Sequence, residues 1–156
     1  MDAELTNKSR EALNIATSSA ASAGHPHLDP AHVLVALLQQ SDNENVLDLL
    51  VAAGADPAEV RAGAERILAG LPRAQGATVG PPQTSREMLA VLAEAGKRAK
   101  DRGDQYLSTE HLLIAIADKG GQSSELLKRH GATAEKLAGA FEENRGDTRI
   151  NTPDPE

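Results

Sequence analysis

The hydrophobic and polar positions of the chain follow a pattern that occurs twice. One copy is Leu107–Ile116 (LSTEHLLIAI), and the other is Leu28–Leu37 (LDPAHVLVAL), 79 positions earlier. In both copies a leucine precedes a residue that can cap a helix (Asp29, Ser108), and a histidine follows three positions after that residue. A capping residue placed before an apolar run is typical of a helix N-terminus. We therefore interpret the chain as two copies of one helical unit.

The first copy is predicted to contain four helices. Their predicted extents are Thr6 to Gly24, Asp29 to Gln40, Ser41 to Gly54, and Asp56 to Ala69. Thr6 can accept a hydrogen bond from the first turn of its helix, and Pro30 suits the first helical position. Ser41 with Glu44, and Asp56 with Glu59, have the spacing of a capping box.

The second copy is predicted to begin at a capping box formed by Thr84 and Glu87. Its first helix has apolar residues at spacings of three and four, which predicts a buried face. These residues are Leu89, Leu92, Ala95 and Ala99. The next helix is predicted to start at Ser108, and the one after it to run through Leu126 and end at Gly131. Thr133 is predicted to cap the last helix, which runs through Phe141.

The fold class that follows is all-α, with two tandem four-helix repeats. We place repeat one at residues 5–69, a Gly- and Pro-rich linker at 70–83, and repeat two at 84–146. A repeat of this length cannot easily bury its own apolar face, so the eight helices should pack as one pseudo-twofold domain over residues 1–146. Residues 147–156 are polar and carry two prolines. We expect them to be a flexible linker to a segment absent from this chain.

Composition narrows the class of protein. Of the 156 residues 40% are hydrophobic but only 1% are aromatic, and cysteine is absent. An alanine-rich, aromatic-poor core suits closely packed helices. The formal net charge of -7 disfavours nucleic acid and anionic membranes as partners. With no apolar run of about 20 residues to span a bilayer, we expect a cytoplasmic protein.

The sequence lacks the common catalytic and phosphate-binding motifs GxSxG, HExxH and GxxxxGK[ST]. We therefore expect no enzyme activity and no cofactor in this fragment. His25, His27 and His32 leave open a metal-dependent hydrolase, although zinc sites usually add thiolates or carboxylates at defined spacings. In the alternative interpretation there is no metal site. His25 and His27 are then loop residues, and His32 and His111 hydrogen-bond back to their capping residues.

Several stretches together resemble a known family. They are LTNK near the start, the doubled histidine-led helix, RGDQYLSTEH, the LL…GAT ending and the closing NRG. In these the chain resembles the N-terminal domains of the ClpB family of ATP-dependent protein disaggregases, from about Leu5 to Gly146. Domains of the ClpC and ClpA unfoldases of Clp proteases share the double repeat. An adaptor-binding or small-molecule-binding domain of that type is the alternative.

The resemblance implies a domain that engages unfolded or aggregated polypeptide and passes it to a homohexameric ATPase ring. It also implies that residues 147–156 lead toward an absent ATPase module, and that ATP and magnesium bind elsewhere in a longer parent protein. A middle domain absent from this chain would contact a DnaK-type chaperone.

The resemblance also implies site residues. Thr6 of LTNK, Asp104 of RGD and Glu110 of STE match family positions implicated in substrate binding. The family's groove lies between the repeats, near the helices before and after RGD. Its apolar candidates in this sequence are Leu92, Ala95, Ala99, Tyr106 and Leu107.

Overall fold

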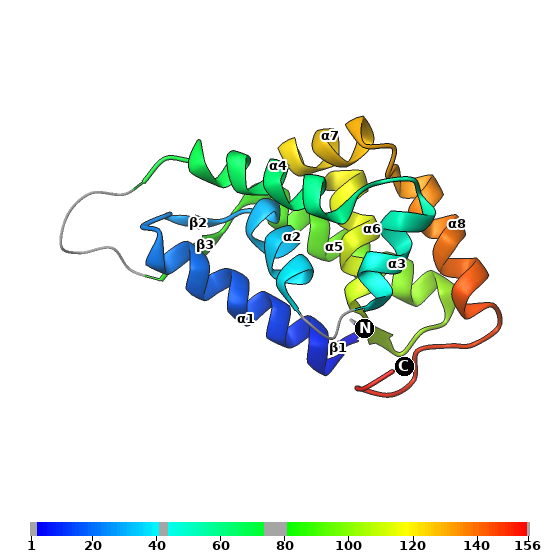
Figure 1. Cartoon of the computed structure of the whole chain (residues 1–156). Coiled ribbons are helices and arrows are strands. Elements are labelled where there is room, and N and C mark those ends of the chain that lie inside the picture. Colours follow the sequence, from blue (N-terminus) through cyan, green and yellow to red (C-terminus); the bar gives the residue numbers. More distant parts are fainter. Residues whose placement is uncertain (1–2, 41–43, 74–80, 156) are drawn as a thin grey trace.

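The computed structural model describes residues 3–40, 44–73 and 81–155. Within these ranges the chain forms eight α-helices and four two-residue strands (Figure 1). In chain order they are β1 (Glu4–Leu5), α1 (Asn7–Ser22), β2 (His27–Leu28), α2 (Pro30–Gln39), α3 (Glu44–Ala52), α4 (Pro57–Ala69), β3 (Gln83–Thr84), α5 (Arg86–Arg102), β4 (Tyr106–Leu107), α6 (Thr109–Lys119), α7 (Gln122–Arg129) and α8 (Ala134–Arg145). The prediction of an all-α fold with two sets of four helices is confirmed. No helix in the described ranges combines the length and hydrophobicity needed to cross a lipid bilayer.

The helices begin where short polar side chains satisfy first-turn N–H groups. Thr6 caps α1 by accepting a hydrogen bond from the Ser9 N–H. The predicted capping box at Thr84 is wrong, because Ser85 caps α5 by accepting from the Met88 N–H, and Thr84 lies in β3. Ser85 is also the residue 79 positions after Thr6, so the correction makes the two repeats more alike.

The capping role predicted for the two central histidines is confirmed. His32 Nδ1 accepts a hydrogen bond of 2.9 Å from the Asp29 N–H, and His111 Nδ1 accepts one of 2.9 Å from the Ser108 N–H. Asp56 caps α4 as predicted, but the Glu59 carboxylate lies 3.8 Å from His130 Nδ1 and completes no capping box. The capping box predicted at Ser41 lies outside the described residues.

Two short parallel sheets connect the halves. β1 pairs with β4, and β2 pairs with β3, so each sheet takes one strand from each half. The Leu107 carbonyl accepts a hydrogen bond from the Thr6 N–H, and the Leu28 carbonyl accepts one from the Ser85 N–H, both at 3.1 Å. Exchanging the halves converts one sheet into the other, which is the pairing expected of a pseudo-twofold domain.

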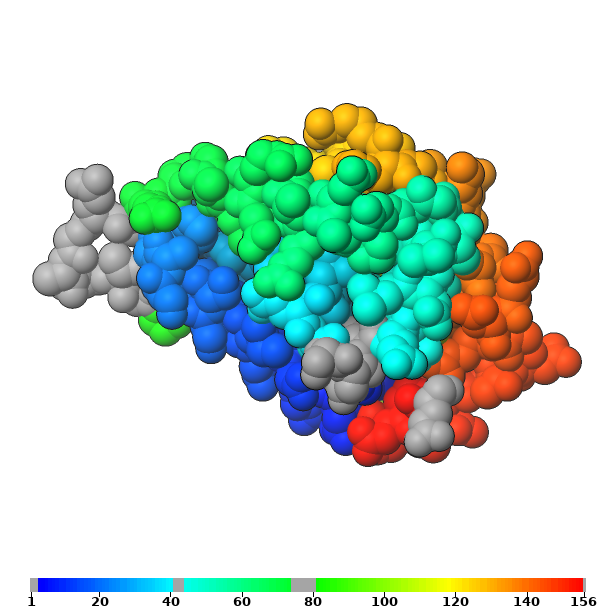
Figure 2. Space-filling model, in the orientation of Figure 1, coloured from blue at the N-terminus to red at the C-terminus, as the bar shows by residue number. Residues whose placement is uncertain are grey.

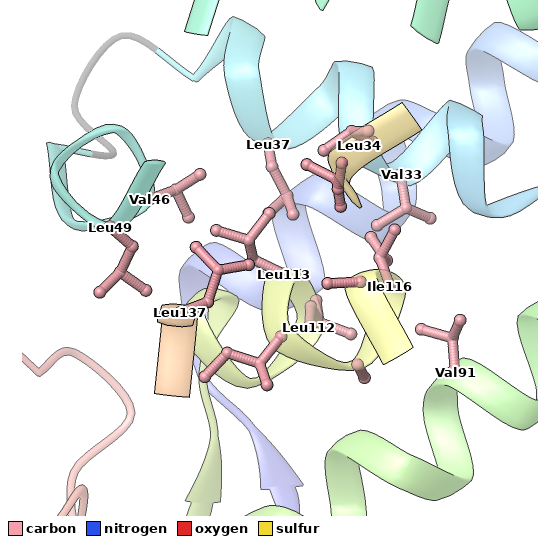
Figure 3. Packing of buried hydrophobic residues seen from close by; sticks show 14 of the residues in the cluster. Val33, Leu34, Leu37, Val46, Leu49, Val91, Leu112, Leu113, Ile116 and Leu137 are labelled. Atoms are coloured by element: carbon pink, nitrogen blue, oxygen red, sulfur yellow. The ribbon is translucent and has the colours of Figure 1, made fainter. Parts of the chain in front are cut away.

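The hydrophobic core lies between α2 and α6. Every residue from Pro30 to Leu37, and every residue from Thr109 to Ala117, is buried, as expected for helices surrounded by other helices. Leu37 of α2 and Leu113 of α6 point toward each other, while Val46 of α3 and Leu137 of α8 close the core on one side (Figure 3). The two repeats therefore share one core.

The helices α4 and α7, from different halves, also pack closely. A Cβ atom placed on Gly63 of α4 would overlap Leu126 Cδ1 of α7. Any larger residue at this position would force the Leu126 side chain to move. Glycine therefore permits the close approach of these two helices.

The buried face of α5 differs from the predicted one. Its buried residues are Met88, Val91, Ala95 and Ala99. Leu89 is 57% exposed, and Leu92 is only half-buried. The predicted spacing of three and four residues is correct. In the N-terminal half of α5, however, the buried residues are Met88 and Val91, each one position before the predicted Leu89 and Leu92.

The C-terminal residues also differ from prediction. Instead of a flexible linker, residues 147–155 run back to the start of α1, and the side chain of Ile150 is 1% exposed. The Asn7 N–H donates a hydrogen bond of 2.8 Å to the Pro153 carbonyl. This segment lies beside the first residues of α1 in the space-filling view (Figure 2). Of the predicted linker 70–83, residues 74–80 lie outside the described part of the chain.

Candidate functional site

The outer side of α5 and the adjoining β4 carry two neighbouring surface depressions. The first has a volume of about 730 Å³ and is lined by Ala3, Leu92, Ala93, Gly96, Lys97, Lys100, Asp101 and Leu107. The second has a volume of about 550 Å³ and is lined by Ala3, Glu4, Lys100, Gly103, Asp104, Gln105 and Tyr106. Both include Ala3 and Lys100, so they form one continuous shallow surface, which we call the α5 groove.

Four of the eight predicted site residues line the α5 groove. Leu92 and Leu107 lie in its first depression, and Asp104 and Tyr106 lie in its second. Leu92 and Tyr106 are half-buried and present apolar surface. Leu107, which is 4% exposed, contributes little to that surface.

Ala95 and Ala99 do not line the α5 groove. Both are fully buried because they lie on the same side of α5 as Met88 and Val91, which faces the core. α6, the helix after RGD, is likewise buried from Thr109 to Ala117. The half of the groove expected from that helix is therefore supplied by β4 and by Ala3, which precedes β1.

Asp104 is the centre of a buried polar network. Its Oδ2 lies 2.9 Å from His111 Nε2, and its Oδ1 accepts hydrogen bonds of 2.8 Å from both Arg102 Nη1 and the Ile150 N–H. Burial by itself would raise the pKa of Asp104. The hydrogen bonds from His111 and Ile150, with the charge of Arg102, hold that pKa below its ordinary value. Asp104 therefore fixes the loop between α5 and β4 and ties it to the C-terminal segment.

Arg102 links this network to α8. Its Nε donates to Glu142 at 2.8 Å, and its guanidinium carbon lies 4.7 Å from the centre of the Phe141 ring. The RGD tripeptide is therefore anchored on both sides rather than displayed.

Thr6 and Glu110 lie in a third, smaller pocket. It has a volume of about 160 Å³ and is lined by Thr6, Lys8, Asn45, Ser108, Thr109, Glu110, Arg145, Pro153, Asp154 and Pro155. Thr6 is 1% exposed and Glu110 is 2% exposed. The Glu110 carboxylate forms a buried ion pair of 2.8 Å with Arg145. Residues of the C-terminal segment form one wall of this pocket.

The first half has a histidine pair at the position that corresponds to Asp104 and His111. His25 Nδ1 lies 2.8 Å from His32 Nε2, and both residues are buried. Burial, followed by the charge of Arg73, lowers the pKa of His25. Burial, followed by His25, lowers the pKa of His32 to about 4. Both imidazoles are therefore neutral near pH 7.

The positions of His25, His27 and His32 bear on the metal hypothesis. Both ring nitrogens of His32 are engaged, one by the Asp29 N–H and the other by His25. His27 lies in β2 with an exposed side chain. Among the described residues, no group of three or more His, Cys, Asp or Glu side chains is placed to hold a metal ion. His32 instead caps α2, and His25 packs against it.

Sequence reasoning missed several residues of the α5 groove, namely Ala3, Ala93, Gly96, Lys97 and Lys100. A signal for them was present: together with Leu89 and Leu92, most recur at spacings of three and four on the side of α5 opposite the buried alanines. Ala3 had no such signal, because only the pairing of β1 with β4 brings it there.

Comparison with known proteins gives concordant results. The Clp repeat (R) N-terminal domain family matches residues 4–130. The chaperone protein ClpB of Streptomyces albus G is 52% identical over the whole chain, which spans 18% of that protein's length. The N-terminal domain of Hsp104 from Candida albicans has a similar fold, with a TM-score of 0.83 and 21% identity over 96% of this chain and 97% of that domain.

A ClpV N-domain solved in complex with a VipB peptide is also similar in fold. Its TM-score is 0.69 at 24% identity, over 89% of this chain and 85% of that one. At these identities the two solved structures establish the fold that the chain shares with them.

Proposed function

The chain belongs to the Clp repeat N-terminal domain family, and from this premise we propose that it is the substrate-recognition domain of a ClpB-type disaggregase. In this role it binds unfolded or aggregated polypeptide weakly and delivers it to a hexameric ATPase ring. The 52% identity to a chaperone ClpB over the full chain favours this role over that of a ClpC-type or ClpA-type adaptor domain.

The observation that carries the proposal is the continuity of the α5 groove. Its floor presents Leu92, Ala93 and Tyr106, and Lys97 and Lys100 stand beside them. A shallow, partly apolar surface of this kind suits loose chain segments of varied sequence better than one defined small molecule. The complex of a ClpV N-domain with a peptide supports the same mode of use.

A weak affinity fits this role. Burying about 300 Å² of apolar surface contributes about 7 kcal/mol. Association costs at least about 4 kcal/mol, which leaves a dissociation constant in the millimolar range. Several domains on one ring would raise the effective concentration without new contacts, and weak binding would allow transfer.

The remaining activities belong to a longer parent. We propose that ATP and magnesium bind to modules outside this chain, and that contact with a DnaK-type chaperone is made by a middle domain outside it. This domain then acts by binding, and a cytoplasmic location suits its clients.

The test is chemical-shift mapping with reduced, carboxymethylated lactalbumin as an unfolded client. We expect amide shifts around Leu92, Gly96, Lys100 and Tyr106. Leu92→Ser should weaken binding about fivefold, the effect of losing roughly 1 kcal/mol of apolar contact. Val51→Ser is the matched control, because Val51 is a 62% exposed apolar residue on α3 that lines neither depression. Shifts confined to other helices, or equal effects of the two substitutions, would refute the placement.

A further inference from the structure

The C-terminal segment Ile150–Pro155 lies on the domain as a bound peptide would. The Ile150 N–H donates to Asp104 Oδ1 at 2.8 Å, and the Ile150 carbonyl accepts from the N–H groups of Gln105 and Tyr106 at 2.8 and 3.1 Å. Its side chain is 1% exposed and packs in the hydrophobic core. One residue therefore supplies a donor, an acceptor and an apolar anchor.

A second set of contacts follows three residues later. The Pro153 carbonyl accepts a hydrogen bond of 2.8 Å from the N–H of Asn7, the first residue of α1. Asp154 Oδ1 accepts one of 2.9 Å from Asn7 Nδ2. The N-terminus of a helix favours carbonyl and carboxylate oxygens, because its first N–H groups lack partners within the helix. The C-terminal segment therefore places oxygen atoms that accept hydrogen bonds next to the N–H donors at the start of α1.

These contacts join regions of functional interest. Asp104 and Tyr106 line the α5 groove, and Thr6 and Glu110 line the small pocket that Pro153, Asp154 and Pro155 help to form. Most of the hydrogen bonds use the main chain of the segment, a mode of recognition that tolerates many sequences. The side-chain requirements are a β-branched aliphatic residue and, four positions later, an acidic one.

We propose that the surface under Ile150–Pro155 is a second binding site for extended client polypeptide, and that the C-terminal segment is its resident occupant. A client segment with an aliphatic residue followed by a Pro-Asp type sequence displaces the C-terminal segment and takes over its contacts with Asp104, Gln105, Tyr106 and Asn7. The client then spans from the α5 groove to the Thr6–Glu110 pocket. This inference rests on the proposed function.

Displacement would have a mechanical consequence. While docked, the C-terminal segment holds its last residues against the start of α1. Once released, those residues become a longer tether between this domain and whatever follows them in the chain. Client binding is then coupled to the length of this tether, because the client and the C-terminal segment cannot use the same contacts at once.

The first experiment uses a fluorescent synthetic peptide of residues 148–155 and the full chain. Ile150→Ser loosens the resident segment, so the variant should bind the peptide at least about fivefold more tightly than the unchanged chain, since an occupied site lowers the apparent affinity. Asn151→Ser is the matched control, because Asn151 is exposed and should leave the affinity unchanged. Asp154→Ala removes the side-chain hydrogen bond with Asn7 and keeps the one to the Pro153 carbonyl, so it should give a smaller gain. It also guards against misfolding of the first variant.

The second experiment follows the segment directly. The chain contains no cysteine, so Thr152→Cys provides one site for a spin label. The label should broaden the amide signals of Asn7 and Tyr106, and addition of carboxymethylated lactalbumin should remove the broadening.

The outcomes separate the two proposals. In one outcome the client shifts the amide signals of Leu92 and Gly96, the label still broadens those of Asn7 and Tyr106, and Ile150→Ser does not bind the peptide more tightly. The second site is then refuted, and the proposed function stands. If the client fails to reach the α5 groove, the proposed function fails, and the peptide experiment still decides whether the second site exists.

Discussion

At the scale of single residues, His25 stands where the second half has Asp104, 79 positions later. The Asp29 N–H donates to His32 Nδ1, so neutral His32 carries its proton on Nε2, and this N–H donates a hydrogen bond to His25 Nδ1. The proton of His25 is then on Nε2, which is buried and has no hydrogen-bond partner among the described residues. In the second half the same chain of hydrogen bonds ends on the Asp104 carboxylate, which accepts a hydrogen bond from His111 Nε2.

This difference predicts that the His25–His32 pair makes the protein sensitive to acid. The pKa of His32 falls from an ordinary value of 6.5 to about 4 in the folded protein, and that of His25 is also lowered. Because the pKa is lowered in the folded state, the contribution of the neutral histidines to the free energy of unfolding is fully present above pH 6.5. It is lost as the pH falls from there toward 4. The loss due to His32 should be on the order of 3 kcal/mol. Urea denaturation at several pH values between 7.5 and 4.5 would measure it.

The control for this effect is His25→Asp, which copies the arrangement of the second half. A carboxylate beside His32 favours the protonated imidazole and raises its pKa. The variant should therefore lose less stability than the original chain between pH 6.5 and 4.5. An identical pH dependence in the two proteins would show that the pair is not responsible.

At the scale of elements, neighbouring residues at the start of α5 have unequal roles. Thr84 and Ser85 both have hydroxyl side chains, but only Ser85 accepts the Met88 N–H, while Thr84 lies exposed in β3 opposite Leu28. The strand pairing determines this choice. The Ser85 N–H bonds to the Leu28 carbonyl, which fixes where the extended backbone ends and the helix begins.

Replacing each hydroxyl should therefore have a different effect. Ser85→Ala should lower the free energy of unfolding by about 1 kcal/mol, the usual cost of losing a helix cap. Thr84→Ala should change it by less than about 0.5 kcal/mol, as expected of an exposed position. Urea denaturation followed by circular dichroism would compare them, and a larger loss for the threonine variant would contradict the cap assignment.

At the scale of the whole molecule, the two repeats share one core, and we expect them to unfold as one cooperative unit. α2 and α6 bury their apolar residues against each other, both sheets take one strand from each half, and α4 packs on α7. Neither half has a core of its own that would remain intact without the other. The pseudo-twofold symmetry is therefore a consequence of two incomplete units completing one another.

Cooperativity predicts that damage in one half destabilises both. Leu113→Ala removes a fully buried side chain of α6 and should cost about 2 to 5 kcal/mol. Its effect should reach the first half equally, so the ring signals of His32 and His111 should change at the same lowered urea concentration. Separate midpoints for the two histidines would show that the halves unfold independently.

The sequence by itself determined the features that depend on neighbours within about four positions. Helix caps are of this kind, which is why Thr6, Asp29 with His32, Ser108 with His111, and Thr133 were identified correctly. The repeat of this local pattern after 79 residues was enough to predict eight helices in two matching sets. The resemblance of RGDQYLSTEH to the ClpB family, also visible in the sequence, indicated that the loop before Ser108 belongs to the candidate site.

Only the tertiary structure decided the features that depend on residues distant in the chain. Whether Val91 or Leu92 faces the core depends on what packs against α5, and the burial of Ala95 and Ala99 follows from the same packing. Asp104 meets Ile150 across 46 positions, and Asn7 meets Asp154 across 147, so the docked C-terminal segment had no local signal. Polar and proline-rich residues read as a linker in sequence because their partners become visible only when the chain has folded back on itself.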